Sequence, residues 1–302
     1  MRLGVDLGGT KIEAILMDRD GNIVERKRVA TPRGDYEQTV LAIRDLVDDV
    51  SRDAPESLPV GMGIPGTVSP ATGLIKNANS TWLIGKPFDK NLEAAMKRPV
   101  RLANDADCFA LSEAADGAGA GHASVFGVIL GTGVGGGVVI NGKPVSGPNA
   151  IAGEWGHNAL PWPEAAELPG PKCYCGKTGC IETWLSGPAL ERQAKSESLS
   201  GLSALDLASA ARSGQEDARA LIEHYADRLA RALAGVINIL DPNVIVLGGG
   251  LSGIDELYTL VPEKWGAHVF SDTVATELKS NTHGDSSGVR GAAWLWPNTE
   301  AH

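Results

Sequence analysis

The sequence predicts a two-lobed α/β protein. Its 302 residues, of which 43% are hydrophobic and 21% charged, are enough for two compact domains. Near the N-terminus, three strand patterns are followed by a helix pattern and a fourth strand. A similar order of elements returns after residue 118 with insertions. We therefore expect one βββαβ unit in each lobe.

The first unit has clear strand, turn and helix signals. Asp20 and Gly21 form a hairpin signal between two strand patterns, so the first three strands are expected to form an antiparallel meander. Asp35 and Gln38 have the spacing of a capping box at a helix start. We expect strands at 2–7, 11–18 and 22–29, a helix at 35–50 and a buried strand at 59–66.

The second unit begins after the glycine-rich segment 116–123. We expect strands at 124–130, 137–140, 143–145 and 243–250, with a hairpin turn at Asn141-Gly142 and helices across 181–240. The resulting small lobe covers residues 1–117, and a C-terminal helix at 286–302 is expected to pack back on it. The large lobe covers residues 118–285.

Charge and hydropathy restrict the partners. The net charge is −10 and the chain has no run of Lys or Arg, which argues against nucleic acid and anionic membranes as partners. The N-terminus lacks a signal-peptide pattern, and no stretch of about 18 apolar residues occurs. We expect a cytoplasmic protein that acts on small molecules.

Three of the four cysteines lie within eight residues. Cys173, Cys175 and Cys180 have the spacing C-x-C-x4-C, and His157 precedes Cys173 across a Pro-rich segment. Disulfides are rare in a reducing compartment, so a Cys3His zinc site is favoured over reduced loop thiols. Cys108 lies in a helix pattern and is expected to be a small buried side chain.

Two glycine-rich loops are candidates for phosphate binding. "DLGGTK" and "LGTGVGGG" each follow a strand and lead into another strand, so neither has the strand-to-helix context of a dinucleotide fingerprint. Glycine allows backbone N–H groups to approach an anion, although glycine in a β-turn needs no ligand. The candidate residues are Gly8, Gly9, Thr10, Lys11, Gly131, Thr132, Gly133 and Gly135.

A kinase also needs a base for the acceptor alcohol. Asn104 and Asp105 lie at an expected strand-to-helix junction. A carboxylate there would be stabilised by helix N-terminal amides and could accept the alcohol's proton. The alternative is that both residues only cap the helix.

Together these motifs resemble one known family. "DLGGTK", "GIPG", "ANDAD", "LGTGVGGG", "GEWGH", "CYCGKTGCIE" and "VIVLGGG" resemble the ROK family of sugar kinases and related repressors over the whole chain. "KNANSTWL", "GEWGHNALPW" and "HGDSSGVRGAAWLWP" resemble the fructokinase and mannokinase members. Fifteen residues separate His157 from Cys173, where many members have about ten.

The resemblance implies a fold and a set of site residues. The fold would be the ribonuclease-H-like, actin/hexokinase-type ATPase fold, with a structural Zn²⁺ that orders the loop 154–182. Asp105 would be the general base, and Mg²⁺ would bridge the ATP phosphates with Asp6 nearby. Gly249 and Gly250 would lie near the adenosine. The sugar would contact Gly66, Asn79, Asn104, Asp105, Glu154, His157 and Glu182, of which Glu154 and Glu182 are otherwise expected to be solvated surface charges.

The resemblance implies a hexose kinase that forms a homodimer. We expect phosphorylation of D-fructose, and of D-mannose as a second substrate, at the 6-hydroxyl. An N-acetylhexosamine kinase is the alternative within the class, because "LGTGVGGG" and "NGKP" also resemble those members. A sugar-sensing repressor would need a helix-turn-helix, whereas this sequence opens with the first strand and carries a negative charge. A zinc-containing binding protein without catalysis remains a third possibility.

Overall fold

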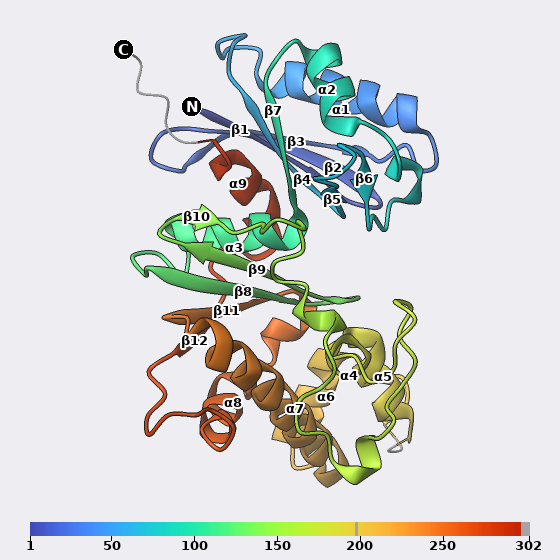
Figure 1. Ribbon diagram of the computed structural model, residues 1–302, viewed down its shortest axis with the longest axis vertical. Coiled ribbons are helices and arrows are strands. Elements are labelled where there is room, and N and C mark those ends of the chain that lie inside the picture. Colours follow the sequence, from blue (N-terminus) through green and yellow to red (C-terminus); the bar gives the residue numbers. More distant parts are fainter. Residues whose placement is uncertain (197–198, 297–302) are drawn as a thin grey trace. The chain divides into compact units, whose positions relative to one another are not determined.

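The computed structural model describes residues 1–196 and 199–296 (Figure 1). The chain forms two compact units. The first unit contains Met1–Gly121, Gly137–Ala152 and the segment from Asp285 onward, and the second contains His122–Gly136 and Gly153–Gly284. The unit boundary therefore passes through strand β9, and residues 137–152 group with the first unit although we had expected them in the large lobe. The lobe boundaries stay a prediction.

A five-stranded mixed sheet forms the first unit. The strand order is β3-β2-β1-β4-β7, in which β1, β2 and β3 pair antiparallel while β4 and β7 pair parallel to β1 and to each other. The predicted meander and the following helix are confirmed. The elements are β1 Arg2–Leu7, β2 Lys11–Met17, β3 Ile23–Ala30, α1 Tyr36–Val50, β4 Val60–Ile64, β5 Thr67–Val68, β6 Ile75–Lys76, α2 Phe88–Met96, β7 Val100–Asn104, α3 Asp105–Asp116 and α9 Ser287–Trp294.

The apolar side chains of β2 point alternately to the two faces of this sheet, which explains why both faces carry helices. Ile12, Ala14 and Leu16 belong to the buried cluster that includes α1 and α2. The intervening Ile15 and Met17 pack with α9 on the opposite face. Since successive strand residues point to opposite faces, a strand with apolar residues at both sets of positions needs a cover on each side.

Helix α9 approaches the sheet closely at glycine positions. A Cβ on Gly61 of β4 would lie 1.8 Å from the Ala292 carbonyl oxygen, and one on Gly4 of β1 would lie 2.3 Å from that of Val289. The absence of a side chain at these positions allows α9 to lie directly on the strands and beside α3 (Figure 1). The outer part of the predicted helix, 297–302, lies outside the described residues.

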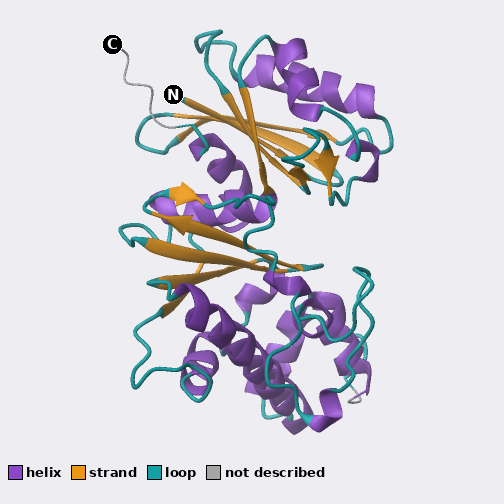
Figure 2. Cartoon of the chain, in the orientation of Figure 1, coloured by secondary structure: helices purple, strands orange, loops and turns teal. Residues whose placement is uncertain are grey.

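The second sheet repeats the order of the first. Its order is β10-β9-β8-β11-β12, and β11 is parallel to β8 and β12. Helices of the second unit pack around the long α7 (Figure 2). The elements are β8 Ser124–Leu130, β9 Val134–Ile140, β10 Lys143–Pro144, α4 Glu182–Leu185, α5 Gly187–Ser196, α6 Ala204–Arg212, α7 Glu216–Leu240, β11 Val244–Gly248, α8 Leu257–Trp265 and β12 Glu277–Ser280.

Strand β9 begins earlier than predicted. We expected a loop through Gly136, but β9 starts at Val134 and so includes Gly135. Side-chain packing accounts for the difference, because a Cβ on Gly136 would lie 2.8 Å from Cδ1 of Trp155. These glycines make room for neighbouring residues as well as forming a turn. Among the described residues, no helix is long and apolar enough to cross a membrane.

Candidate active site and metal centre

The carboxyl ends of β1, β4 and β7 gather the predicted residues of the first unit. The three strands are parallel, so Asp6, Gly66 and Asn104 lie at one edge of the sheet. Backbone bonds join the neighbouring loops, since the Asn79 N–H donates to the Pro65 carbonyl at 3.0 Å. A Cβ on Gly66 would lie 2.8 Å from the Cβ of Ala78, so a side chain there would push these loops apart.

The sequence suggested two roles for Asn104 and Asp105, helix capping and presentation of a carboxylate, and in the structure each residue has one of them. Asn104 is the N-cap of α3, and its Oδ1 accepts from the Ala106 N–H at 2.9 Å while its Nδ2 donates to the Gly66 carbonyl at 3.4 Å. Asp105 is exposed at the first residue of the helix, where its Oδ1 also accepts from the Ala106 N–H. Asn104 is thus a helix cap, and Asp105 presents a carboxylate near the helix N-terminus.

Asp6 is the strongly perturbed acid of this edge. Burial, then the negative charges of Asp105 and Glu13, raise the pKa of Asp6 to about 7, and Lys11 opposes the shift. Gly63 and Gly288 border the Asp6 carboxyl group. A Cβ on Gly63 would lie 3.3 Å from it, and a Cβ on Gly288 would lie 3.5 Å from it. Two acids that disfavour each other's ionisation form a site at which a cation would be stabilised.

The loop between β1 and β2 is held from both sides. The Gly8 N–H donates to the Lys11 carbonyl at 2.9 Å, and the Thr31 hydroxyl donates to the Gly8 carbonyl at 2.8 Å. The Thr31 N–H donates to the Thr10 carbonyl at 3.0 Å. Gly9, Thr10 and Lys11 remain exposed. This fixed turn presents an ammonium group and a hydroxyl, as phosphate binding requires.

The second unit has its own glycine-rich edge at the ends of β8 and β11. A Cβ on Gly249, whose φ is +82°, would lie 2.4 Å from the Leu130 carbonyl oxygen, so the two loops touch through backbone. The Gly131 N–H donates to the Gly133 carbonyl at 3.0 Å, and Thr132 and Gly250 are exposed. The predicted nucleotide residues of this unit therefore lie together.

Glu182 connects this edge to the cysteine-containing loop. Its Oε2 accepts from the Val134 N–H at 2.9 Å, directly after the glycine turn. Trp155, next to Glu154, donates from Nε1 to the Gly135 carbonyl at 3.0 Å. The sequence reasoning did not anticipate that the segments of Glu154 and Glu182 both hydrogen-bond to the phosphate-loop region.

The four predicted zinc ligands converge. The ligand atoms of His157, Cys173, Cys175 and Cys180 all lie within 4.8 Å of one another. His157 Nδ1 is 3.6 Å from the Cys173 Sγ, and the Sγ atoms of Cys175 and Cys180 are also 3.6 Å apart. Tetrahedral zinc with Zn–S bonds of about 2.3 Å separates its sulfur ligands by about 3.8 Å. The arrangement therefore fits a closed four-ligand zinc site.

Backbone pairing brings the ligands into register. Ala159 forms an antiparallel bridge with Cys180, and Lys172 forms one with Thr178. These bridges place His157 beside Cys180 and close the turn that carries Cys173 and Cys175. The loop is thus shaped by backbone hydrogen bonds in addition to any metal.

The longer segment between His157 and Cys173 contains a buried glutamate that anchors it to the rest of the second unit. Glu167 accepts from both terminal nitrogens of Arg231 at 2.9 Å and from Nε of Arg228 at 2.6 Å, both on α7. Burial alone would raise the pKa of Glu167, but the bonds from Arg231 and Arg228 outweigh it and lower the pKa to about 2. The inserted segment is therefore fixed to α7.

Tyr174 is a neighbour of the site that the sequence reasoning missed. Its hydroxyl lies 2.9 Å from His157 Nε2. Partial burial, followed by the charge of Glu182, raises the pKa of Tyr174 to about 12. The available signal was an aromatic residue between two cysteines that are both candidate metal ligands.

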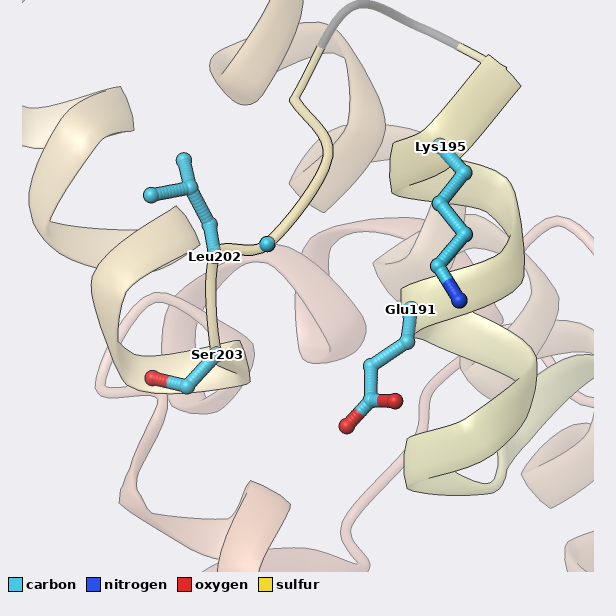
Figure 3. Close-up of a pocket in the computed structure, with 5 residues that line it drawn as sticks. Glu191, Lys195, Leu202 and Ser203 are labelled. Atoms are coloured by element: carbon cyan, nitrogen blue, oxygen red, sulfur yellow. The ribbon is translucent and has the colours of Figure 1, made fainter.

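One cavity lies apart from these residues. It measures about 300 Å³ and lies between α5 and the segment before α6, with Glu191 and Lys195 on one side and Leu202 and Ser203 on the other (Figure 3). None of the predicted site residues lines it. The cavity is therefore not part of the candidate site.

Comparison with known proteins supports the family. The ROK family model matches residues 2–299. The chain belongs to the ROK family. It is 40% identical over 299 residues to an N-acetyl-D-glucosamine kinase of Pectobacterium carotovorum, covering 98% of both chains.

Two solved structures are similar to this chain over nearly its whole length. One is a ROK hexokinase from Thermus thermophilus, with 32% identity, 97% of each chain covered and a TM-score of 0.83. The other is a ROK family glucokinase from Streptomyces griseus in complex with glucose and AMPPNP, with 30% identity, coverage of 97% and 98%, and a TM-score of 0.77. The hexokinase-type fold is confirmed.

The expected subfamily is wrong. The relatives at about 40% identity are N-acetyl-D-glucosamine kinases rather than fructokinases or mannokinases. The segment "NANSTWL" had favoured fructose, but most of it is structural: Ser80 and Leu83 are buried, and Trp82 Nε1 donates to Thr39 Oγ1 at 3.2 Å. A segment occupied with packing carries little information about the substrate.

Proposed function

We propose that this chain is an ATP-dependent N-acetyl-D-glucosamine kinase that phosphorylates the primary 6-hydroxyl. The observation that carries the proposal is the 40% identity over 98% of the chain to proteins of that name. The site residues support it, because carboxylates and amides suit a ligand with many hydroxyl groups.

Asp105 is proposed as the general base. It is exposed at the first turn of α3, where the helix N-terminus stabilises its ionised form. Asp105 would orient the attacking hydroxyl and accept its proton as the phosphoryl group transfers. Asn104 holds the start of α3 against Gly66 and so fixes the direction of that carboxylate.

Each glycine-rich edge is proposed as a contact for the nucleotide. In the first unit, Lys11 and the N–H groups of the β1–β2 turn would contact phosphate oxygens. In the second unit, the turn after β8 and the loop at Gly249 would do the same and contact the nucleoside. The raised pKa of Asp6 fits a cation neighbour, and Mg²⁺ bound there would neutralise charge on the phosphates.

The zinc site is proposed to be structural. Four protein ligands leave no open coordination position, so the metal would supply a cross-link between His157 and the cysteine turn. That cross-link would hold the segment of Glu154 and Glu182 in place for the sugar. We propose that these two carboxylates accept hydrogen bonds from sugar hydroxyls.

A coupled ADP-release assay with Mg-ATP tests the proposal. The sugars are N-acetylglucosamine, N-acetylmannosamine, glucose, mannose and fructose, compared by kcat/KM. We expect N-acetylglucosamine to exceed every other sugar at least tenfold. A lead by another sugar would overturn the proposed substrate, and no turnover with any sugar would favour a binding protein without catalysis.

A further inference from the structure

Charged side chains cross the first sheet on the face that α9 covers. Asp6 of β1 is directly opposite Glu13 of β2, and Glu13 is directly opposite Arg28 of β3. Arg26 is directly opposite Ile15, which packs with α9. Because successive strand residues point to opposite faces, the side chains of these four charged residues all lie on the α9 side of the sheet.

Glu13 is a buried carboxylate that holds two arginines in place. Its side chain is 2% exposed. Its Oε1 accepts from Nε of Arg26 at 2.5 Å, and its Oε2 accepts from Nε of Arg28 at 2.8 Å. Two acids directly opposite each other in a sheet repel, so these guanidinium groups compensate the charge of Glu13 beside Asp6. The same bonds fix the direction of both arginine side chains.

Arg26 also bonds to the segment at the start of α9. Its Nη2 donates to Oγ of Ser286 at 2.5 Å. Ser286 directly precedes the helix, just after the chain re-enters the first unit at Asp285. The Oγ of the next residue, Ser287, donates to Oε1 of Glu113 on α3 at 2.9 Å. The start of α9 is therefore attached both to β3 and to α3.

This attached end of the helix is the part of α9 that borders Asp6. A Cβ on Gly288, the second residue of α9, would lie 3.5 Å from Cγ of Asp6. Glycine allows the helix backbone to come this close to the carboxyl group. A shift of the first turn of α9 would therefore change the surface against which the Asp6 carboxyl group packs.

We propose that Arg26 is a positioning residue for the phosphoryl transfer. Supported by Glu13, it fixes the first turn of α9 against Asp6 and so holds the Asp6 carboxylate in place for Mg²⁺. This inference rests on the proposed function, in which Asp6 is the neighbour of the metal. Mg²⁺ demands near-ideal octahedral geometry, so a small displacement of a carboxylate beside it weakens binding. Arg26 acts through Ser286 and the helix rather than by contact with a substrate.

The test is Ser286→Ala in the full chain, because it removes the acceptor of Arg26 and leaves both bonds to Glu13 in place. The free Mg²⁺ concentration that gives half-maximal activity at fixed ATP should rise about fivefold, since one hydrogen bond from a charged group is lost. KM for N-acetylglucosamine should change less than about twofold. In the protein without Mg²⁺ or substrates, hydrogen exchange of residues 287–294 should become about fivefold faster. Arg26→Met should produce the same changes.

Lys27→Met is the matched control. Lys27 follows Arg26 on β3 but points to the opposite face, where its Nζ lies 2.6 Å from Oδ2 of Asp49 on α1. The substitution removes the same charge from the same strand. It should leave the Mg²⁺ requirement and the exchange of α9 unchanged.

Several results would overturn the inference. They are a wild-type Mg²⁺ requirement or wild-type exchange of α9 in Ser286→Ala, equal changes in Lys27→Met, and a rise in sugar KM as large as the rise in Mg²⁺ requirement, which would indicate a general structural loss. If Arg26→Met does not fold, Ser286→Ala decides alone. Failure of the wild-type chain to phosphorylate N-acetylglucosamine would instead overturn the proposed function, and the exchange experiment would still show whether Arg26 holds the start of α9.

Discussion

The buried anchor of the inserted segment gives a quantitative prediction. Glu167→Gln keeps the size of the side chain but removes its charge, leaving Arg228 and Arg231 without the carboxylate that both contact. The carboxylate is 5% exposed and Arg231 is 4% exposed. Removing one partner of such a buried pair costs about 3–5 kcal/mol, because the remaining charge stays buried.

The pKa of Glu167 provides a second measure of the same interaction. Its decrease from 4.5 to about 2 corresponds to about 3 kcal/mol. Because the folded pKa is depressed, this stability is present above pH 4.5 and is lost as the pH falls towards 2. The two routes together predict that Glu167→Gln lowers the free energy of unfolding by about 3 kcal/mol at pH 7.

Chemical denaturation at pH 7 and at about pH 3 measures this effect, with hydrogen exchange of residues 158–172 as the local readout. Glu223→Gln is the matched control, since Glu223 lies exposed on α7 and pairs only with Arg219, at 3.9 Å, in the described structure. It should cost less than about 0.5 kcal/mol. Equal stability of Glu167→Gln and Glu223→Gln at pH 7 would refute the reasoning.

Four further predictions concern the site. Asp6→Asn should raise the melting temperature by several degrees above pH 7, because ionising this buried acid destabilises the fold as pH rises from about 4 to 7; a variant no more stable at pH 8 than wild type would contradict the raised pKa. In the wild type, kcat/KM for ATP should rise through about pH 7 as Asp6 ionises. Asp105→Asn should keep sugar affinity and lower kcat 10²- to 10⁴-fold (an order-of-magnitude range for lost base catalysis), and near-normal kcat would remove Asp105 from that role. Cys175→Ser or chelation should release zinc and raise KM for the sugar, whereas an unchanged KM after verified zinc loss would separate metal from substrate binding.

Local patterns predicted the elements well where side-chain periodicity and turn chemistry agreed. β1 and β8 have their expected bounds, and α1 starts one residue after its predicted cap, Asp35. The cluster of His157 with three cysteines was predicted because metal coordination restricts both residue type and spacing. Asp105 was placed at a helix start because its strand-to-helix junction is visible in the sequence.

Contacts between distant segments could not be predicted in the same way. Glu167 and Arg231 are 64 residues apart, and nothing in either local pattern indicates that they pair. The bond from the Val134 N–H to Glu182 likewise depends on how β8, β9 and the cysteine-containing loop fold together. The expected subfamily was wrong for a related reason, since a few hydrogen-bond partners decide which sugar binds and their positions are set by the tertiary structure.

The close packing of α9 against Gly4 and Gly61 has a consequence for synthesis of the chain. The glycine surface of β1 and β4 is made first, but the helix that covers it is encoded about 220 residues later than β4 and emerges from the ribosome after the whole second unit. Until then the part of that sheet face that α9 covers is exposed, including Ile15 and Met17. The second unit, which ends before α9, has all its residues available earlier, so the unit whose strands are translated first is the one completed last.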